Sequence, residues 1–150
     1  MEKGEDINKC AAQGDEKMRD YQRTKNNKYI LPSAVYHQTI WIIRDYYRMR
    51  QEANDILTES SAAADGMPHC GNSTSDVVTR KAIKREKLIE KTTAIEAALS
   101  SIPSEYQKPI WKNILYGIPF PSNADRSTYG RNKAKFIAST AERLGLYDDI

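Results

Sequence analysis

Apolar residues recur at helical intervals in four stretches of the chain, and no stretch shows the apolar-polar alternation of a strand. The first stretch covers residues 32–57. Its apolar positions are separated by four, three and four residues: Tyr36, Ile40, Ile43 and Tyr47. This pattern predicts one amphipathic helix of about 24 residues that begins at the Pro-Ser pair 32–33 and ends near Leu57.

A second stretch, over residues 76–100, has a narrower apolar seam that is typical of helix pairing. Its seam residues are Leu88, Thr92, Ile95, Leu99 and Ile102. The opposite face is basic, with Arg80, Lys81, Lys84, Arg85, Lys87 and Lys91. Glu86 and Glu90 interrupt that basic face, which favours a solvated surface over the alternative, a DNA contact outside the groove.

Two shorter helices are predicted within residues 101–150. The first follows Pro103, with Ser104 as its expected N-cap, and ends at Gly117. The second runs from about Arg126 to Leu144 and is followed by Gly145. The turn "IPFPSNAD" separates them, and its Asn123 or Asp125 is expected to cap the second helix.

The remaining segments lack a periodic pattern. Residues 1–31 are polar and predict a flexible leader, and residues 58–75 are rich in Ser, Gly, Asp and Pro and predict a loop. The expected fold class is therefore all-α, an elongated helical arm followed by a helix-turn-helix-like C-terminal unit. The apolar share of 39% is below the usual 45–50% or so, which suits an elongated protein with a modest core.

Charge and cysteine content indicate which kind of partner and which cellular compartment to expect. The net charge is +3, and residues 66–150 hold 13 Lys and Arg against 9 Asp and Glu, whereas residues 1–65 hold 10 against 11. A basic C-terminal half suits a polyanionic partner. Two cysteines, no apolar leader and no long apolar run lead us to expect a cytoplasmic protein without membrane contact.

The segment "ADRSTYGRNKAKF", residues 124–136, is the strongest candidate for chemistry. A helix with a cationic and hydroxyl-rich first half, braced by a preceding helix, is the outline of a DNA reader, and its free N-terminal N–H groups would favour phosphate. A solvated surface helix is the alternative. The expected DNA-contacting residues are Arg126, Ser127, Thr128, Tyr129, Arg131, Asn132, Lys133 and Lys135.

The stretches "DGMPHC", "EYQKPIWKNILYG" and "PFPSNADRSTYGRNKAKF" resemble small phage and prophage proteins of the RinA-type transcriptional-activator group, over about residues 65–146. These proteins are similar to region four of sigma factors. The resemblance implies a helix-turn-helix fold, sequence-specific binding of double-stranded DNA and no catalysis. In that pattern Ser127, Thr128, Tyr129, Arg131 and Lys135 meet DNA, and Trp111 and Tyr116 lie on the supporting helix.

Two features depart from that pattern. The turn "IPFPSNAD" is too short and too rich in proline for the separate positioning helix of sigma region four. Gly130 lies inside the predicted reading helix, where glycine costs about 1 kcal/mol relative to alanine. Such a glycine permits close approach of another backbone.

Other residue groups do not indicate an enzyme or a metalloprotein. His69, Cys70 and Asp65 are too few for a zinc site, and His37 and Cys10 are remote in sequence. We expect no cofactor. The aromatic residues of the first helix are expected in the core, or in part at an oligomer interface: Tyr36, Trp41, Tyr46 and Tyr47.

Three functional hypotheses follow. The first is a phage transcription regulator whose residues 101–146 bind DNA, while the preceding helices form a homodimer or contact RNA polymerase. The second is a phage packaging or structural subunit, similar to a small terminase subunit, that forms a ring. The third is a helical protein-interaction module whose basic helix docks on an acidic partner. Oligomer size separates the first two hypotheses.

Overall fold

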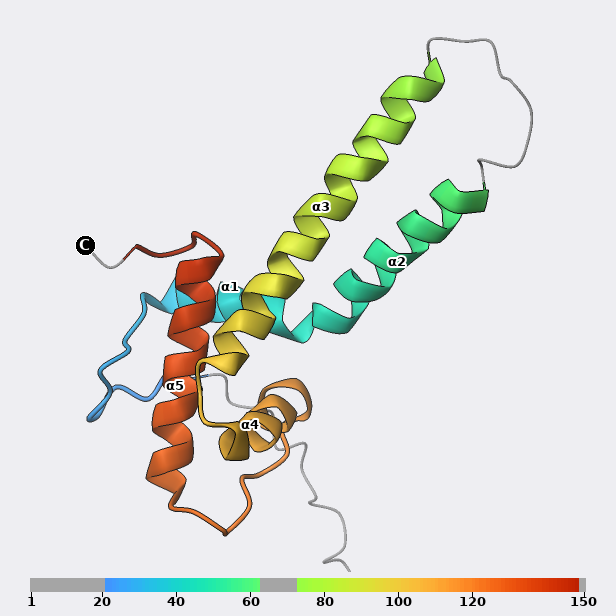
Figure 1. The fold of residues 1–150 in the computed structure, drawn as a ribbon. Coiled ribbons are helices and arrows are strands. Elements are labelled where there is room, and N and C mark those ends of the chain that lie inside the picture. Colours follow the sequence, from blue (N-terminus) through green and yellow to red (C-terminus); the bar gives the residue numbers. More distant parts are fainter. Residues whose placement is uncertain (1–20, 63–72, 149–150) are drawn as a thin grey trace, which may run out of the picture.

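The described residues form an all-helical structure, as the sequence predicts. The computed structural model describes residues 21–62 and 73–148, and this part of the chain contains no β-strand. Figure 1 shows the arrangement of its helices. They are α1 (Ser33–Arg44), α2 (Tyr46–Ala62), α3 (Ser73–Ser100), α4 (Ser104–Tyr116) and α5 (Arg126–Arg143).

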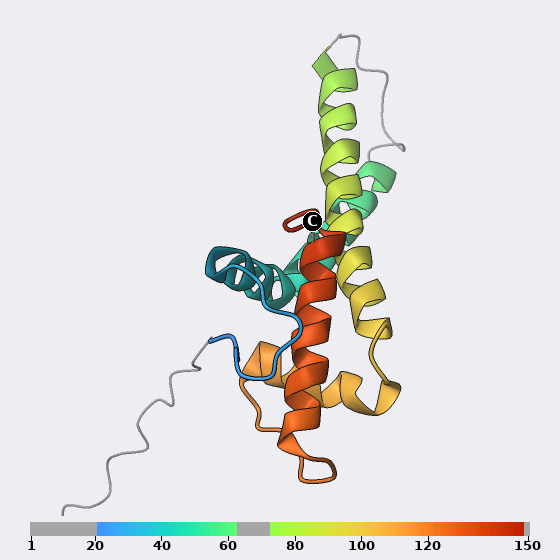
Figure 2. The same ribbon diagram turned by 90° about the vertical axis from the view of Figure 1, so that its left-hand side faces the viewer.

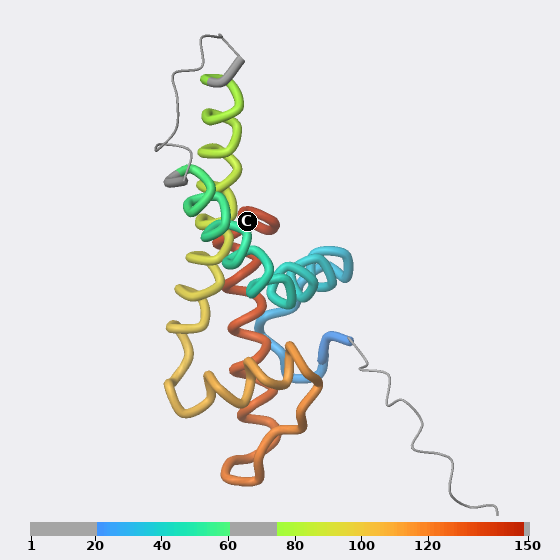
Figure 3. The backbone as a smooth tube through the Cα atoms, turned by 90° about the vertical axis from the view of Figure 1, so that its right-hand side faces the viewer, coloured from blue at the N-terminus to red at the C-terminus, as the bar shows by residue number. Residues whose placement is uncertain are grey.

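Helices α2 and α3 run side by side as an arm that extends away from the other helices (Figures 1 and 3). The buried residues of the arm come from both helices: Met49, Ala53, Ile56, Leu88, Thr92 and Ile95. Ion pairs join its edges, with Lys84 paired to Glu52 and Lys81 to Glu59. The seam predicted for residues 76–100 therefore does serve helix pairing.

The single helix predicted over residues 32–57 is wrong, because the chain bends at Asp45. Asp45 ends α1 and its carboxylate accepts hydrogen bonds from Arg48 in the first turn of α2, at 2.6 Å from Nε. Aspartate favours such capping positions over helix interiors. The bend lets α1 pack on α4 and α5 while α2 packs mainly on α3.

Helix α5 is the centre of the fold, because it packs against α1, α3 and α4 (Figure 2). Phe136, Ile137 and Thr140 on its inner face are at most 2% exposed. The buried residues of the five helices belong to one continuous core. Residues 101–150 thus share their core with the rest of the chain.

The helix ends follow local chemistry closely. Asp125 caps α5, accepting a hydrogen bond from the Ser127 backbone N–H, as the sequence predicts. Pro103, rather than Ser104, holds the cap position of α4, and no side chain caps that end. Gly117 adopts a left-handed conformation with φ of 67° at the end of α4, where glycine carries no steric penalty.

The predicted loop over residues 58–75 is shorter than expected. Helix α2 continues to Ala62 and α3 begins at Ser73, so helix replaces both ends of that segment. The remainder of this loop, and residues 1–20 of the predicted leader, lie outside the described residues. Residues 21–31 are non-helical and run alongside α5 (Figures 1 and 2).

A matched pair of isoleucines on α3 tests this packing. Ile95 is fully buried, so Ile95→Ala should lower the free energy of unfolding by about 2–5 kcal/mol. Ile83 is 48% exposed on the same helix, so Ile83→Ala should change it by less than about 0.5 kcal/mol. Chemical denaturation of both variants measures the difference, and equal losses would contradict the placement of the α3 seam.

Candidate nucleic-acid interface

One face of α5 points away from the core and carries four of the predicted contact residues. Thr128, Arg131, Asn132 and Lys135 line a cavity of about 340 Å³ together with residues 26–29. Positions 128, 131, 132 and 135 are separated by three, one and three residues, so they share one side of the helix. We call these four residues the outer face of α5.

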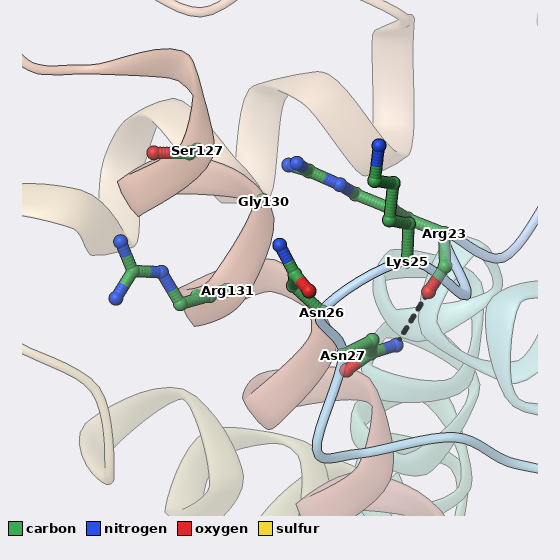
Figure 4. Close-up of a pocket in the computed structure, with 7 residues that line it drawn as sticks. All are labelled: Arg23, Lys25, Asn26, Asn27, Ser127, Gly130 and Arg131. Atoms are coloured by element: carbon green, nitrogen blue, oxygen red, sulfur yellow. Dashed lines mark hydrogen bonds between the residues drawn. The ribbon is translucent and has the colours of Figure 1, made fainter.

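A second cavity, of about 370 Å³, lies between α5 and residues 23–27 (Figure 4). Arg23, Lys25 and Arg131 contribute three cations to its lining. The other lining residues are neutral: Asn26, Asn27, Ser127 and Gly130. No carboxylate lines this cavity, and Arg131 also lines the cavity at the outer face of α5. The two cavities therefore form neighbouring cationic surfaces that share one arginine.

Sequence reasoning missed Arg23, Lys25 and Lys28, because it assigned them to a flexible leader. In the structure, Lys28 lines the cavity at the outer face of α5, and Arg23 and Lys25 line the second cavity. The stretch "RTKNNK" carried a partial signal, since paired asparagines favour turns and three of its six residues are basic. Nothing in the sequence indicated that this turn lies against residue 130.

Gly130 now has a physical explanation. A Cβ atom at this position would lie 3.2 Å from Nη1 of Arg23, closer than most carbon contacts of this kind. The missing side chain therefore lets the Arg23 guanidinium cross close to the helix, as Figure 4 shows. The close approach anticipated at Gly130 is made by a side chain from residues 21–31, and it involves no other backbone.

The prediction that Tyr129 contacts DNA is wrong, because Tyr129 is fully buried. Its ring stacks on Phe120 at 4.8 Å between centroids and meets Tyr106 edge-on at 5.2 Å. Its hydroxyl donates a hydrogen bond to Oδ1 of Asn123 at 2.6 Å. Tyr129 is therefore a core residue that fixes the turn before α5 to α4 and α5.

The N-terminus of α5 is also not free to receive phosphate, contrary to the sequence-based expectation. The Ser127 hydroxyl donates to Asp125 at 2.5 Å, so this predicted phosphate donor is already engaged. This hydrogen bond, together with the backbone N–H groups of Ser127 and Arg126 and the nearby Arg131 charge, lowers the pKa of Asp125. An ionised carboxylate thus occupies the site where a phosphate was expected.

Lys133 and Arg126 lie on a different side of α5 from its outer face. The Lys133 ammonium donates a hydrogen bond to Oδ1 of Asn113 at 2.8 Å, which joins α5 to α4. Both cations line a third cavity, of about 230 Å³, between α5 and residues 21–29. Lys133 therefore braces the two helices, and its expected role along a DNA backbone stays a prediction.

The basic residues of the arm differ from those around α5 in their pairing. Arg80 pairs with Asp76 at 2.7 Å, and Lys81 pairs with Glu59 at 2.9 Å. Within the described part of the chain, no ion pair is formed by Arg23, Lys25, Lys28, Arg126 or Lys135. Lys87 and Lys91 of the arm likewise form no ion pair in this part of the chain, but the five cations listed above gather on and beside α5, where they favour an anionic partner.

The aromatic residues of the first predicted helix divide between core and surface. Tyr36 and Tyr46 are buried as expected, whereas Trp41 is 65% exposed and Tyr47 is 53% exposed. Tyr47 accepts a hydrogen bond from Nε1 of Trp111 at 3.1 Å, and the Arg44 guanidinium lies 5.6 Å from the Trp41 ring centroid. The core placement is therefore confirmed for Tyr36 and Tyr46, and the oligomer-interface alternative stays a prediction for Trp41 and Tyr47.

Among the described residues there is no candidate metal site and no candidate membrane-spanning helix. The His69, Cys70, Asp65 and Cys10 considered as metal ligands lie outside them. Within residues 21–62 and 73–148, no three His, Cys, Asp or Glu side chains gather closely enough to hold a metal ion. None of the described helices combines the length and apolar character needed to cross a bilayer.

Comparisons with known proteins give no further identification. No protein-family model, no curated protein and no solved structure matches this chain.

The buried position of Tyr129 generates a test. Tyr129→Phe should lower the free energy of unfolding by about 1 kcal/mol, because it removes the hydroxyl hydrogen bond to Asn123 and keeps the ring. Tyr116→Phe, on a residue that is 64% exposed, is the matched control and should leave stability unchanged. Duplex binding should be the same in both variants, and a selective loss in Tyr129→Phe would restore Tyr129 as a contact.

Proposed function

We propose that this protein binds double-stranded DNA through the outer face of α5 and regulates transcription of phage genes. The observation that carries the proposal is the set of cations that line the two cavities beside α5, whose linings include no carboxylate. Duplex DNA is a dense polyanion, and such a surface gains affinity by displacing its counterions. The regulatory role rests on the resemblance to the RinA-type group.

The chemistry of the outer face suits a nucleic acid. Arg131 is exposed and lies one helical turn before Lys135, so both side chains can reach a phosphate backbone or a guanine edge. Thr128 and Asn132 add neutral hydrogen-bonding groups beside them. The Asn132 amide donates to the Thr128 backbone carbonyl at 3.0 Å, and its carbonyl oxygen can still accept a hydrogen bond.

The neighbouring helix supplies rigidity. Lys133 joins α5 to Asn113, and the Arg44 Nε donates to the Ile114 carbonyl at 3.0 Å near the end of α4. A helix held by its neighbours presents its outer residues with little loss of conformational freedom on binding. Such bracing supports the helix-turn-helix hypothesis, which assigns this role to α4.

The arm provides one observation that favours self-association. Several apolar side chains on α2 and α3 are exposed: Leu57, Val77, Val78, Ile83 and Ile89. A homodimer through the arm would suit a regulator, and a ring of many copies would suit the packaging hypothesis. Sedimentation equilibrium of the full chain distinguishes these two functions. Contact with RNA polymerase is a further part of the regulatory proposal.

Duplex binding by charge-removal variants tests the proposal. Arg131→Ala combined with Lys135→Ala should weaken binding by about tenfold or more and reduce the salt-dependence slope by about two. Fluorescence anisotropy over a salt series, with a duplex selected from a random pool, gives both quantities. Stability should stay within about 0.5 kcal/mol, because both residues lie on the surface of α5.

A control variant removes two positive charges from α3, away from the proposed interface. Lys87 and Lys91 are exposed on α3 with the same spacing of four residues. Lys87→Ala combined with Lys91→Ala should leave affinity nearly unchanged if the interface lies at α5. Equal losses in the two double variants would show that only net charge matters, and would contradict a specific interface on α5.

A further inference from the structure

The cavity between α5 and residues 23–27 has the chemistry of an anion site that the sequence did not indicate. Its charged lining residues are Arg23, Lys25 and Arg131, all cationic. Asp125, the N-cap of α5, accepts hydrogen bonds from Ser127 and interacts with the Arg131 charge, but it does not line the cavity. We propose that residues 23–28 and α5 together hold a backbone phosphate of the bound nucleic acid in this cavity.

The segment that carries Arg23 and Lys25 is held in place by its own hydrogen bonds. The Gln22 side chain donates to the Leu31 carbonyl and accepts from the Leu31 N–H, each at 2.7 Å. Asn27 donates to the Arg23 carbonyl at 2.7 Å and accepts from the Tyr29 N–H at 2.8 Å. Asn26 takes a left-handed conformation with φ of 56°, which asparagine tolerates. The cations are therefore positioned before a ligand arrives.

The glycine in α5 is a second and independent observation. Glycine inside a helix costs about 1 kcal/mol relative to alanine, so its presence needs a local reason. At Gly130 that reason is the Arg23 guanidinium, whose Nη1 lies 3.2 Å from the position of a Cβ atom. In Figure 4 the Arg23 side chain extends toward Gly130, while Arg131 extends from the helix on the other side of this glycine. A side chain at this position would displace the Arg23 guanidinium by a few tenths of an ångström, so the glycine allows the present arrangement of the two arginines at the cavity.

Continuity with the outer face of α5 favours a nucleic-acid backbone as the source of this anion. Arg131 lines both cavities, and Lys28 and Lys135 line the cavity at the outer face of α5. A strand of successive phosphates can therefore follow one path past both cavities. The guanidinium and ammonium groups match phosphate oxygens as charge-assisted donors. This inference rests on the proposed function, since it adds residues 23–28 to the same interface.

The decisive experiment measures duplex binding over a salt series for three double variants of the full chain. They are the Arg23 and Lys25 variant, the Arg131 and Lys135 variant, and the Lys87 and Lys91 control. Arg23→Ala combined with Lys25→Ala should weaken binding by about tenfold and reduce the salt slope by about two. The Lys87→Ala and Lys91→Ala control should bind like the original protein. Both residues of the test variant are exposed, so thermal unfolding should show an intact fold.

Gly130→Ala should also weaken duplex binding, by less than the Arg23 and Lys25 variant does. It should leave the protein at least as stable, because alanine is the better helix former.

The outcomes separate this inference from the proposed function. If the Arg23 and Lys25 variant binds normally while the Arg131 and Lys135 variant does not, the inference is overturned and DNA binding by α5 stands. If the original protein binds no duplex, the proposed function fails and the inference fails with it. Competition with polyglutamate tests the ligand class. If polyglutamate displaces labelled duplex as effectively as unlabelled duplex does, the site binds acidic peptides and the phosphate assignment is overturned.

Discussion

Burial of one face of α5 is the interaction on which the rest of this structure depends. Phe136 and Tyr129 are fully buried, and the helix packs against α1, α3 and α4 at once. Removing a buried aromatic of this size costs about 3–5 kcal/mol, comparable to a large part of the stability of a small domain. The same burial sets the rotation of α5 about its axis, so Arg131 and Lys135 must lie on the outer side.

The cations of this protein divide into two groups with different partners. On the arm, four cations among the described residues pair with nearby carboxylates: Arg48, Arg80, Lys81 and Lys84. Around α5, cations of residues 23–28 and of the helix line two cavities whose linings include no carboxylate, and Asp125 at the start of the helix interacts with Arg131. Exposed pairs contribute little to stability, so the arrangement matters chiefly for where the positive potential is concentrated.

Two local features of α5, its Asp125 cap and Gly130, affect both the stability of the helix and its ability to bind anions. The N-terminus of α5 is closed by Asp125, which stabilises the helix and removes the anion site that an open helix end would offer. Gly130 weakens the helix and admits Arg23. The proposed interface therefore depends on side-chain cations from two segments far apart in the sequence, whereas the helix dipole contributes little to it.

The sequence was sufficient to predict the all-α class, the pairing seam of α3, a cap of α5 at Asn123 or Asp125 and the helix end at Gly117, because each depends on residues within a few positions of one another. It also placed Arg131 and Lys135 in the candidate interface. Four other features depend on contacts between distant segments: the bend at Asp45, the burial of Tyr129, the pairing of Lys133 with Asn113 and the position of Arg23 beside Gly130. The apolar stripe is continuous through Asp45, so the sequence could not show that its packing partner changes there. A tyrosine within a basic stretch suits either surface or core, and the choice depends on Phe120 and Tyr106, which other segments bring to it.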